Sequence, residues 1–520
     1  TAQDLVIGGQ SGIQTAAGTS AVLAGTITSS GQVGCFTKSG SGALVLTGSA
    51  TMSAGTCVQE GLLRANGSLN SWVRVDPAGM LRGIGSVSGD ILVNGTLAPG
   101  NSPGTLTVNG SVNLAAGSAL EIDVDGLGTG TGKGNYSRII LSGSNSVFSA
   151  GGTLKPILRG ITGNASNVFT PAIGDTFHIV QAQGGIKGQF ASLAQPTEGM
   201  TANARFALFY GANAIDMFVV PVSYGQWLQG HADGNAQRVG YLLDTLGSAR
   251  DAHTATLDQT GLLYTIASAN QPQLAMLATG LAGEVHAQMA AAAREASLGV
   301  TGDVDSHMRE APLTSDPANH GTRAWATTSE SGYRVSADAE APGIHSRLSR
   351  TTAGLDIYRG ERVLWGFGAA HTDTRLQDTP DSGTIRGNGI LAYAEAKAGG
   401  ALIDGTASWS ADQWRSHRSD PLGLAGGLNG NAAGSSVAAS LTARFPVSLK
   451  AAVVEPYLQS VWQHIQRDGI HEEGDALTGL DVGSFAASGT RLLAGVDLTS
   501  MARDPLLSSV TYRLGAALGA

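Results

Sequence analysis

The sequence contains few of the residues from which functional sites are usually built. Of its 520 residues, two are cysteines, 5% are aromatic and 14% are charged. Neither Cys35 nor Cys57 has a histidine or a second cysteine nearby, which argues against a metal site. The net charge of −9 argues against binding to nucleic acid, which requires a basic face. No run of about 18 uninterrupted apolar residues occurs, so no transmembrane helix is predicted, whereas a transmembrane β-barrel stays open.

Glycine is abundant, with 74 residues, alongside many small and β-branched residues. This composition suits stacked short strands rather than packed helices. In the stretch 89–104, Ile91, Val93 and Leu97 alternate with polar residues, and Asn-Gly and Pro-Gly pairs close each short run. The pattern predicts short strands with abrupt corners. Such strands cannot bury a face alone, so we expect them to stack on copies of themselves.

Two motifs in this region resemble those of classical (type V) autotransporters. Residues 36–48 resemble the repeat of a pertactin-like passenger, and Leu97-Ala-Pro-Gly-Asn-Ser-Pro-Gly104 resembles the segment that ends it. The resemblance implies a mainly β protein whose order of parts is that of the family. The implied parts are the end of a right-handed parallel β-helix at 1–126, an autochaperone cap at 127–221, a helical linker at 222–319 and an antiparallel outer-membrane β-barrel at 320–520.

The spacing of the two cysteines fits the coil length of such a β-helix. They lie 22 positions apart, which is about one coil. One interpretation is therefore that Cys35 and Cys57 stack and form a disulfide in an oxidising compartment. The other is that they are two small buried residues, and the sequence favours neither.

From Tyr224 onward, apolar residues recur about every 3.6 residues instead of every second residue. The clearest helix is predicted over residues 273–298, about 37 Å long and enough to cross a barrel. Its apolar stripe comprises Leu274, Leu277, Leu281, Val285 and Met289. The resemblance implies that this helix spans the barrel pore. Without the flanking β-regions, a helical hairpin of a soluble domain would be the simpler interpretation.

After residue 320, segments of about ten residues alternate between an apolar face and a small or polar face. This pattern is typical of an outer-membrane barrel with lipid outside and a polar lumen. A soluble β-sandwich shares the alternation, but the preceding pore-length helix favours the barrel. We count about nine strands, which start near Thr322, Thr351, Val363, Gly387, Ala401, Ser436, Pro456, Arg491 and Ser508.

The family closes its barrel with twelve strands and ends in an aromatic residue. The sequence is therefore expected to be a fragment, truncated before Thr1 and after Ala520. Inside the lumen, Gly366 and Gly368 are expected to make room for the helix. Three arginines are expected to face helix acids across the lumen, namely Arg444, Arg491 and Arg513 facing Glu284 or Glu295. The alternative is that these charges only hydrate the lumen.

No pattern in the sequence predicts catalysis or a cofactor. Gly100-Asn-Ser102-Pro-Gly104 matches the hydrolase string G-x-S-x-G, but Pro103 removes a backbone N–H and a strand follows, so a corner turn is expected. The histidines lack metal-binding spacing, and no phosphate-binding or dinucleotide-binding fingerprint occurs. Some family members cleave their helix at an Asn-Asn pair, which the helix here lacks, so no self-cleavage by that route is expected.

The resemblance implies an outer-membrane translocator and surface anchor for a secreted, adhesin-like passenger. One alternative is the stalk of an enzymatic passenger, a protease or esterase whose catalytic domain lies upstream, and another is a soluble repeat protein with a C-terminal β-domain. The expected partners are outer-membrane lipid, the barrel-assembly machinery, periplasmic chaperones and a passenger ligand such as a host surface or polysaccharide, without nucleic acid. The barrel is expected in a bacterial outer membrane with the passenger at the cell surface.

Overall fold

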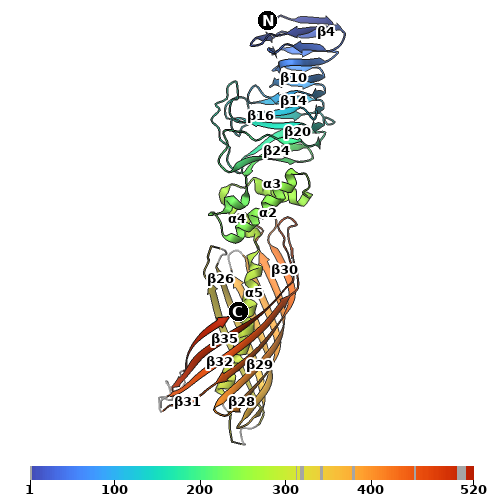
Figure 1. The fold of residues 1–520 in the computed structure, drawn as a ribbon. Coiled ribbons are helices and arrows are strands. Elements are labelled where there is room, and N and C mark those ends of the chain that lie inside the picture. Colours follow the sequence, from blue (N-terminus) through green and yellow to red (C-terminus); the bar gives the residue numbers. More distant parts are fainter. Residues whose placement is uncertain are drawn as a thin grey trace. The chain divides into compact units, whose positions relative to one another are not determined.

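The computed structural model confirms a mainly β fold (Figure 1). It describes residues 3–311, 313–316, 321–339, 343–377, 381–449, 452–500 and 511–519. The chain divides into two compact units, one of residues 1–228 with 240–275 and the other of residues 229–239 with 276–520. Among the described residues, no helix combines the length and apolar character needed to cross a membrane.

The first unit is a stack of short parallel strands that forms two long sheets. One sheet has the order β1 (Leu5–Gly9), β4 (Ile27–Gln32), β7 (Ser49–Thr51), β9 (Ser68–Asn70), β11 (Ser86–Ser88), β14 (Thr105–Asn109), β17 (Arg138–Leu141), β20 (Thr176–Ala182), β24 (Ala214–Pro221) and β23 (Ala204–Tyr210). The other contains β2 (Gly12–Gln14), β3 (Ser20–Leu23), β5 (Phe36–Ser39), β6 (Ala43–Leu46), β8 (Thr56–Ala65), β10 (Val73–Gly83), β12 (Ile91–Val93), β13 (Thr96–Pro99), β15 (Val112–Leu114), β16 (Ala119–Asp123), β18 (Phe148–Ala150), β19 (Thr153–Ile157), β21 (Ile186–Gly188) and β22 (Ser192–Leu193).

Parallel stacking continues past residue 126, because β17 pairs with β20, β18 with β21 and β19 with β22, all in parallel. The direction changes at β24, which is antiparallel to both β20 and β23. An antiparallel hairpin at the end of a parallel stack stops further coils from being added in register.

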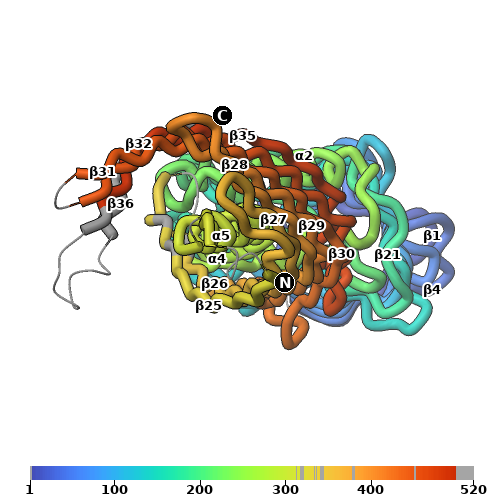
Figure 2. The backbone as a smooth tube through the Cα atoms, turned by 90° about the horizontal axis from the view of Figure 1, so that it is seen from below, coloured from blue at the N-terminus to red at the C-terminus, as the bar shows by residue number. Residues whose placement is uncertain are grey.

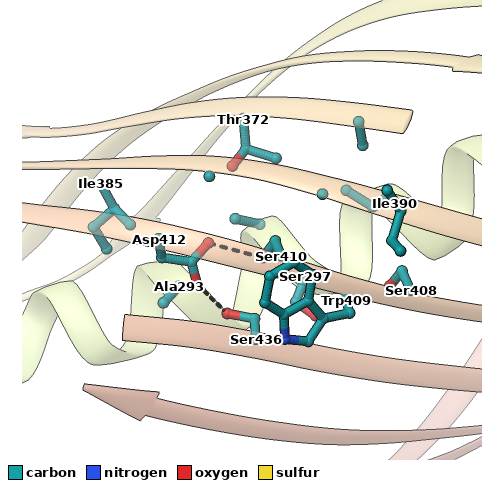
Figure 3. A pocket seen from close by; sticks show the side chains of 15 residues that line it. Ala293, Ser297, Thr372, Ile385, Ile390, Ser408, Trp409, Ser410, Asp412 and Ser436 are labelled. Atoms are coloured by element: carbon teal, nitrogen blue, oxygen red, sulfur yellow. Dashed lines mark hydrogen bonds between the residues drawn. The ribbon is translucent and has the colours of Figure 1, made fainter. Parts of the chain in front are cut away.

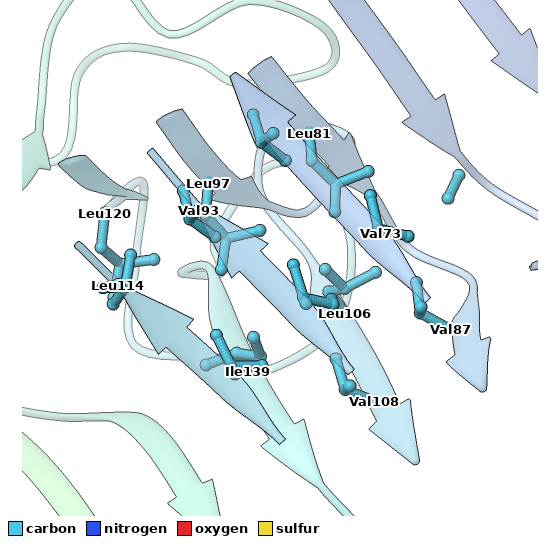
Figure 4. Close-up of a cluster of buried hydrophobic side chains, with 14 of the residues drawn as sticks. Val73, Leu81, Val87, Val93, Leu97, Leu106, Val108, Leu114, Leu120 and Ile139 are labelled. Carbon is cyan, nitrogen blue, oxygen red and sulfur yellow. The ribbon is translucent and has the colours of Figure 1, made fainter. Parts of the chain in front are cut away.

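The core of the stack consists of aligned rows of branched aliphatic side chains (Figure 4). Ile91 lies opposite Val73 in one neighbouring coil and opposite Val112 in the next. All three side chains are buried. Burying each such side chain contributes roughly 1.5–3 kcal/mol, so the alternation read in the sequence stabilises the stack coil by coil. Glycine is needed where coils approach closely, since a Cβ at Gly61 (φ +67°) would lie 2.5 Å from the Gly40 carbonyl oxygen.

A disulfide joins Cys35 to Cys57, with their Cα atoms 5.7 Å apart. Cys57 lies opposite Thr37 on β5, so the bond fastens one coil to the next. Closing a loop of this length stabilises a protein by about 3 kcal/mol.

The glycine- and proline-rich motif of residues 97–104 is tied into the stack by a buried arginine. Arg82 Nη1 donates to Ser102 Oγ at 2.7 Å, and Arg82 Nη2 lies 3.2 Å from Asp123 Oδ2. Burial raises the pKa of Asp123, although Arg82 opposes that shift. Ser102 is therefore a buried acceptor in a corner rather than a nucleophile on a strand-to-helix elbow.

Within the described residues, five helices follow the stack in sequence. They are α1 (Tyr224–Leu228), α2 (Gly234–Asp251), α3 (Leu257–Ala267), α4 (Gln271–Leu281) and α5 (Glu284–Glu310). α3 begins at a capping box, in which Thr256 and Gln259 each bond the other's backbone N–H.

The second unit is a curled antiparallel sheet. Its long strands follow the order β25 (Arg323–Val335), β26 (Ile344–Arg359), β27 (Val363–Gln377), β28 (Ser382–Ala398), β29 (Ala401–Arg418), β30 (Leu428–Arg444), β32 (Ala452–Arg467), β35 (Phe485–Ser500) and β36 (Thr511–Gly519). Three short strands accompany them, β31 (Val447–Ser448), β33 (Ile470–Glu473) and β34 (Asp481–Val482). Each predicted strand corresponds to one of these long strands, but β26, β28, β30, β32 and β35 begin four to eight residues earlier than predicted. The predicted start at Ser508 lies outside the described residues. Within the described chain, β25 and β36 do not pair with each other.

The two faces of this sheet differ in chemistry, as the alternation predicted. Large apolar side chains are exposed on the outer face, including Trp365, Phe367, Ile390, Trp409, Leu441 and Trp462. The inner face buries polar groups such as Asp404, Asp412 and Thr442. The strands curve around α5 (Figure 2).

Candidate functional site: the lumen and its helix

The helix inside the curled sheet is α5, which begins later and ends later than predicted. The helix predicted over residues 273–298 is instead two helices, because Gly283 adopts a left-handed conformation (φ 64°) between α4 and α5. Leu274, Leu277 and Leu281 therefore lie on α4 and not on the lumen helix. Of the predicted stripe, Val285 and Met289 belong to α5.

α5 makes apolar contacts with the wall near its end, where Val304 and Met308 pack with Leu364, and near its beginning. Val285 and Met289 pack with Leu376, Ile385, Trp414 and Ile465 from the inner face of the sheet. The glycine that makes room for this contact is Gly383, where a Cβ would lie 2.7 Å from the Met289 side chain.

Gly366 and Gly368 lie on the inner face of β27, but they accommodate other neighbours than the helix. A Cβ at Gly366 would lie 2.5 Å from the Tyr393 hydroxyl, and a Cβ at Gly368 would lie 2.2 Å from the Ala353 carbonyl oxygen. These two glycines therefore allow Tyr393 and the adjacent strand to approach, which corrects the prediction that they make room for the helix.

The first turn of α5 is held by a buried ionic cluster. His286 Nε2 lies 2.8 Å from Glu472 Oε1, and Arg418 Nη2 donates to Glu472 Oε2 at 2.6 Å. Arg418 also donates to the carbonyl oxygen of Gly280, at 2.5 Å, on the last turn of α4. Since Arg418 and Glu472 are fully buried, these contacts fix the point where the chain enters the lumen.

The middle of α5 is held through Asp303. Its carboxylate accepts hydrogen bonds from Arg350 Nε at 3.3 Å, Thr352 Oγ1 at 3.0 Å and Ser329 Oγ at 3.1 Å. Gly299, one turn earlier, leaves the space that the Arg350 guanidinium occupies, because a Cβ there would lie 2.4 Å from Arg350 Cζ.

The end of α5 contacts the wall through two further side chains. Arg309 Nη1 lies 2.5 Å from Glu455 Oε1 and 2.6 Å from Asp497 Oδ2. His307 Nε2 lies 2.9 Å from Asp356 Oδ1, and its ring stacks on Trp325 with centroids 4.1 Å apart.

The arginines and acids that were predicted to pair across the lumen have other partners or none among the described residues. Arg444 pairs with Glu395 and Asp404 on neighbouring strands of the wall, and not with an acid of the helix. Glu284 instead accepts a hydrogen bond from Asn235, at 2.8 Å. Arg491 is exposed on the inner face of β35, Glu295 is exposed on α5, and neither forms an ion pair within the described residues. Arg513 lies on β36, where only the backbone is described.

The space between α5 and the wall differs from place to place. A cavity of about 330 Å³ lies between α5, at Glu295 and Gly299, and the strands β25–β27. The space on the other side of the helix is smaller. A cavity of about 30 Å³ lies between the small side chains Ala293 and Ser297 of α5 and the strands β27–β30 (Figure 3). Asp412 faces it and accepts hydrogen bonds from Ser410 and Ser436, at 2.8 and 2.5 Å. This volume holds about one or two waters.

The polar residues of α5 beyond residue 298 were missed because the prediction stopped at the glycines Gly299 and Gly302. A signal was nevertheless present. Asp303, Asp305, His307 and Arg309 point in several directions around a helix, and a helix that is polar on all sides needs partners around it. A barrel lumen supplies such partners.

Residues 324–517, which cover β25 to β36, match the family model of the autotransporter β-domain. The curled sheet is thus an autotransporter β-domain, the part that type V autotransporters place in the outer membrane. The barrel works as a translocator in the bacterial outer membrane, with the passenger exposed at the surface, and the translocator domain is not itself catalytic.

Two individual proteins are similar to this chain. An extracellular serine protease of Serratia marcescens is 23% identical over 492 residues, which is 85% of this chain and 45% of that protein. The chain thus spans about half the length of the curated relative that it matches. The translocator domain of the autotransporter NalP from Neisseria meningitidis superposes with a TM-score of 0.38 and 18% identity, covering 46% of this chain and 79% of that one.

Proposed function

We propose that the barrel retains α5 as a fixed plug and thereby anchors the passenger covalently at the cell surface. The observation that carries this proposal is that α5 is bonded to the wall near both ends, by His286 at its start and by Arg309 at its end. Breaking either set removes a hydrogen-bond partner from a buried carboxylate, although Glu472 keeps Arg418 and Glu455 keeps Arg444. Each such hydrogen bond to a charged group contributes about 1.5–3 kcal/mol. In this proposal residues 1–126 are passenger, 127–221 its cap, 222–319 the linker and 320–520 the anchor.

We infer that the passenger acts as an adhesin through its outer walls. Its outward side chains form ladders along the stack, and several are apolar and exposed, such as Trp72 (44%), Val22 (46%) and Leu92 (41%). Exposed aromatic and aliphatic groups on a rigid, regular wall suit contact with a host surface or a polysaccharide. Outer-membrane lipid, the barrel-assembly machinery and periplasmic chaperones are the further proposed partners.

An enzymatic passenger is the second candidate, favoured by the name of the serine protease relative. In that case the catalytic domain lies outside the residues described above, because Ser102 is buried and bonded to Arg82. The residues seen here would then be a stalk between enzyme and barrel.

The experiment is whole-cell binding by cells that display the full chain. Adhesion to cultured epithelial cells is compared before and after external protease removes the passenger, with Trp72→Ser as a matched surface variant. Adhesion lost on both treatments supports the adhesin, whereas undiminished adhesion overturns it. Hydrolysis of casein by the same cells, abolished by a serine-reactive inhibitor, would favour the enzymatic alternative.

A further inference from the structure

Five arginines lie on the outer face of the sheet, at the same end of their strands. They are Arg334, Arg347, Arg375, Arg386 and Arg415, and we call them the arginine patch. The side chains of Arg347, Arg375 and Arg386 are 73%, 63% and 51% exposed. Four of them alternate along their strands with buried neighbours on the inner face, and Arg334 lies opposite the exposed His345, so none of the five points into the lumen.

The strand register brings the patch together. Arg347 on β26 lies directly opposite Arg375 on β27. Arg375 lies opposite Thr384 on β28, and Thr384 lies opposite Arg415 on β29. Three arginines therefore share one row across four strands, a width of roughly 14 Å at 4.8 Å per strand. Arg386 lies in the next row, opposite Asp373.

The patch lies beyond one edge of the apolar outer band. Along β28, Arg386 precedes the exposed Ile390 by four positions, which is roughly 13 Å at 3.3 Å per residue. Since the lipid-facing band of an outer-membrane barrel is about 25 Å tall, side chains at this distance reach the level of the lipid headgroups.

This edge is the outer one. α5 begins at the same end, because Met289 packs against Gly383 on β28 and Arg418 at the end of β29 bonds the Gly280 carbonyl. From Gly280 the chain runs back toward the passenger, which is at the cell surface. The patch therefore faces the outer leaflet.

The patch carries an excess of positive charge in a chain whose net charge is −9. Two acids lie within it: Glu330 pairs with Arg347 at 2.6 Å, and Asp373 is shared by Arg375 at 3.1 Å and Arg386 at 3.4 Å. Arg415 forms no ion pair within the described part of the chain. Arg347 and Arg375 are like charges at directly opposite positions, an arrangement that weakens strand pairing even though each arginine has an acid partner.

We propose that the arginine patch binds the phosphate groups of a phosphorylated glycolipid of the outer leaflet. A guanidinium group offers two parallel N–H donors that match a phosphate, and a row of three spans more than one phosphate. The apolar band directly below the patch packs against the acyl chains of the same lipid. The proposal rests on the outer-membrane location of the barrel and is independent of what the passenger binds.

The test measures lipid retained by the full-length protein in detergent, using native mass spectrometry. The probes are lipopolysaccharide and the same lipopolysaccharide after enzymatic removal of its phosphates. The variant is R347Q/R375Q/R415Q. The matched control, R323Q/R362Q/K397Q, removes the same charge from exposed positions at the other end of the strands. Heat-modifiable gel mobility reports that each variant is folded.

The wild type and the control are expected to retain lipopolysaccharide equally, and the patch variant at least about tenfold less, since each arginine near a charged lipid surface contributes roughly fivefold. Dephosphorylated lipopolysaccharide should bind the wild type as weakly as it binds the variant. Should the triple variant fail to fold, Arg415→Gln alone is used, because it breaks no ion pair among the described residues. This single variant is expected to retain about fivefold less lipopolysaccharide than the wild type.

Three results would overturn the proposal. Equal retention by the patch variant and the wild type would remove the patch from lipid binding. Equal binding of the dephosphorylated lipid would show that phosphate is not recognised. Displacement of the lipid by an equal concentration of inorganic phosphate would identify a site for free anions instead. A failed adhesion assay has no bearing on any of these readouts.

Discussion

Replacing Arg309 by methionine is expected to destabilise the plugged barrel by about 3–5 kcal/mol. Arg309 on α5 lies 2.5 Å from Glu455 and 2.6 Å from Asp497, and all three side chains are at most 15% exposed. Methionine preserves most of the volume but removes the cation that the two carboxylates share, and Glu455 then keeps its second ion pair, with Arg444 at 3.4 Å. The loss therefore comes from uncompensated charge and not from a cavity.

The assay is the temperature at which the folded, fast-migrating form converts to the unfolded form on a gel. For a domain of about 200 residues, each kcal/mol lowers the midpoint by roughly 2–4 °C, so a decrease of roughly 6–20 °C is expected. Arg294→Met is the matched control, because Arg294 is exposed on the same helix and its side chain forms no ion pair within the described residues.

A second variant separates charge from packing. Removing the charge on all three partners in R309M/E455Q/D497N should recover most of the lost midpoint, because the two like-charged carboxylates are then neutral. The reasoning is refuted if Arg309→Met unfolds within about 1 °C of the wild type, or if the triple variant is less stable than the single one.

Three further perturbations test the remaining parts of the structure. Replacing Cys35 and Cys57 by serine should lower the free energy of unfolding of the passenger, measured in urea, by about 3 kcal/mol. Chemical reduction of the wild type should lower it by the same amount. An unchanged free energy of unfolding would contradict a closed disulfide. Burial opposes ionisation of Asp125, but the hydrogen bonds that Ser166 and Asn167 donate to its carboxylate outweigh burial and lower the pKa of Asp125. The carboxylate therefore stabilises the fold fully above about pH 4–5, and this stabilisation is lost as the pH falls further. Asp125→Asn should flatten that pH dependence, and an unchanged slope would refute the assignment. Met289→Ala should cost about 2–5 kcal/mol of barrel stability, whereas Met276→Ala, at a side chain 75% exposed, should cost almost nothing; equal losses would contradict the packing of α5.

The β-regions could be predicted because their signals are local. Alternation at Ile91, Val93 and Leu97 sets which side chains point inward, and the same period of two separates the outward Trp409 from the inward Asp412 three residues on. The mainly β fold and the run of barrel strands are accordingly confirmed.

The boundary of the lumen helix could not be read in the same way. The stripe from Leu274 to Met289 continues across Gly283 without a change of period, so its sequence pattern does not show the break. α4 ends because of contacts with distant parts of the chain. Arg418 donates a hydrogen bond to the Gly280 carbonyl oxygen, and Leu480 lies so close to Gly283 that a Cβ there would be 2.3 Å from it. These partners are more than a hundred residues away in sequence.

The contacts across the lumen were also beyond the sequence. The predicted partners of Arg444 were helix acids, but the register of β28, β29 and β30 places Glu395 and Asp404 nearer to it. Which charge meets which depends on strand tilt and on the rotation of α5, and neither is encoded in a local pattern.

The central claim is that this chain anchors a surface-exposed β-helix by a plugged outer-membrane barrel. It is tested most directly by treating intact cells that express the full chain with external protease, then fractionating the membranes. The account predicts that residues before α5 are digested while a fragment of α5 with the strands survives in the outer-membrane fraction and shifts its gel mobility on heating. Recovery of the whole chain undigested, or in the soluble fraction without a heat shift, would contradict it.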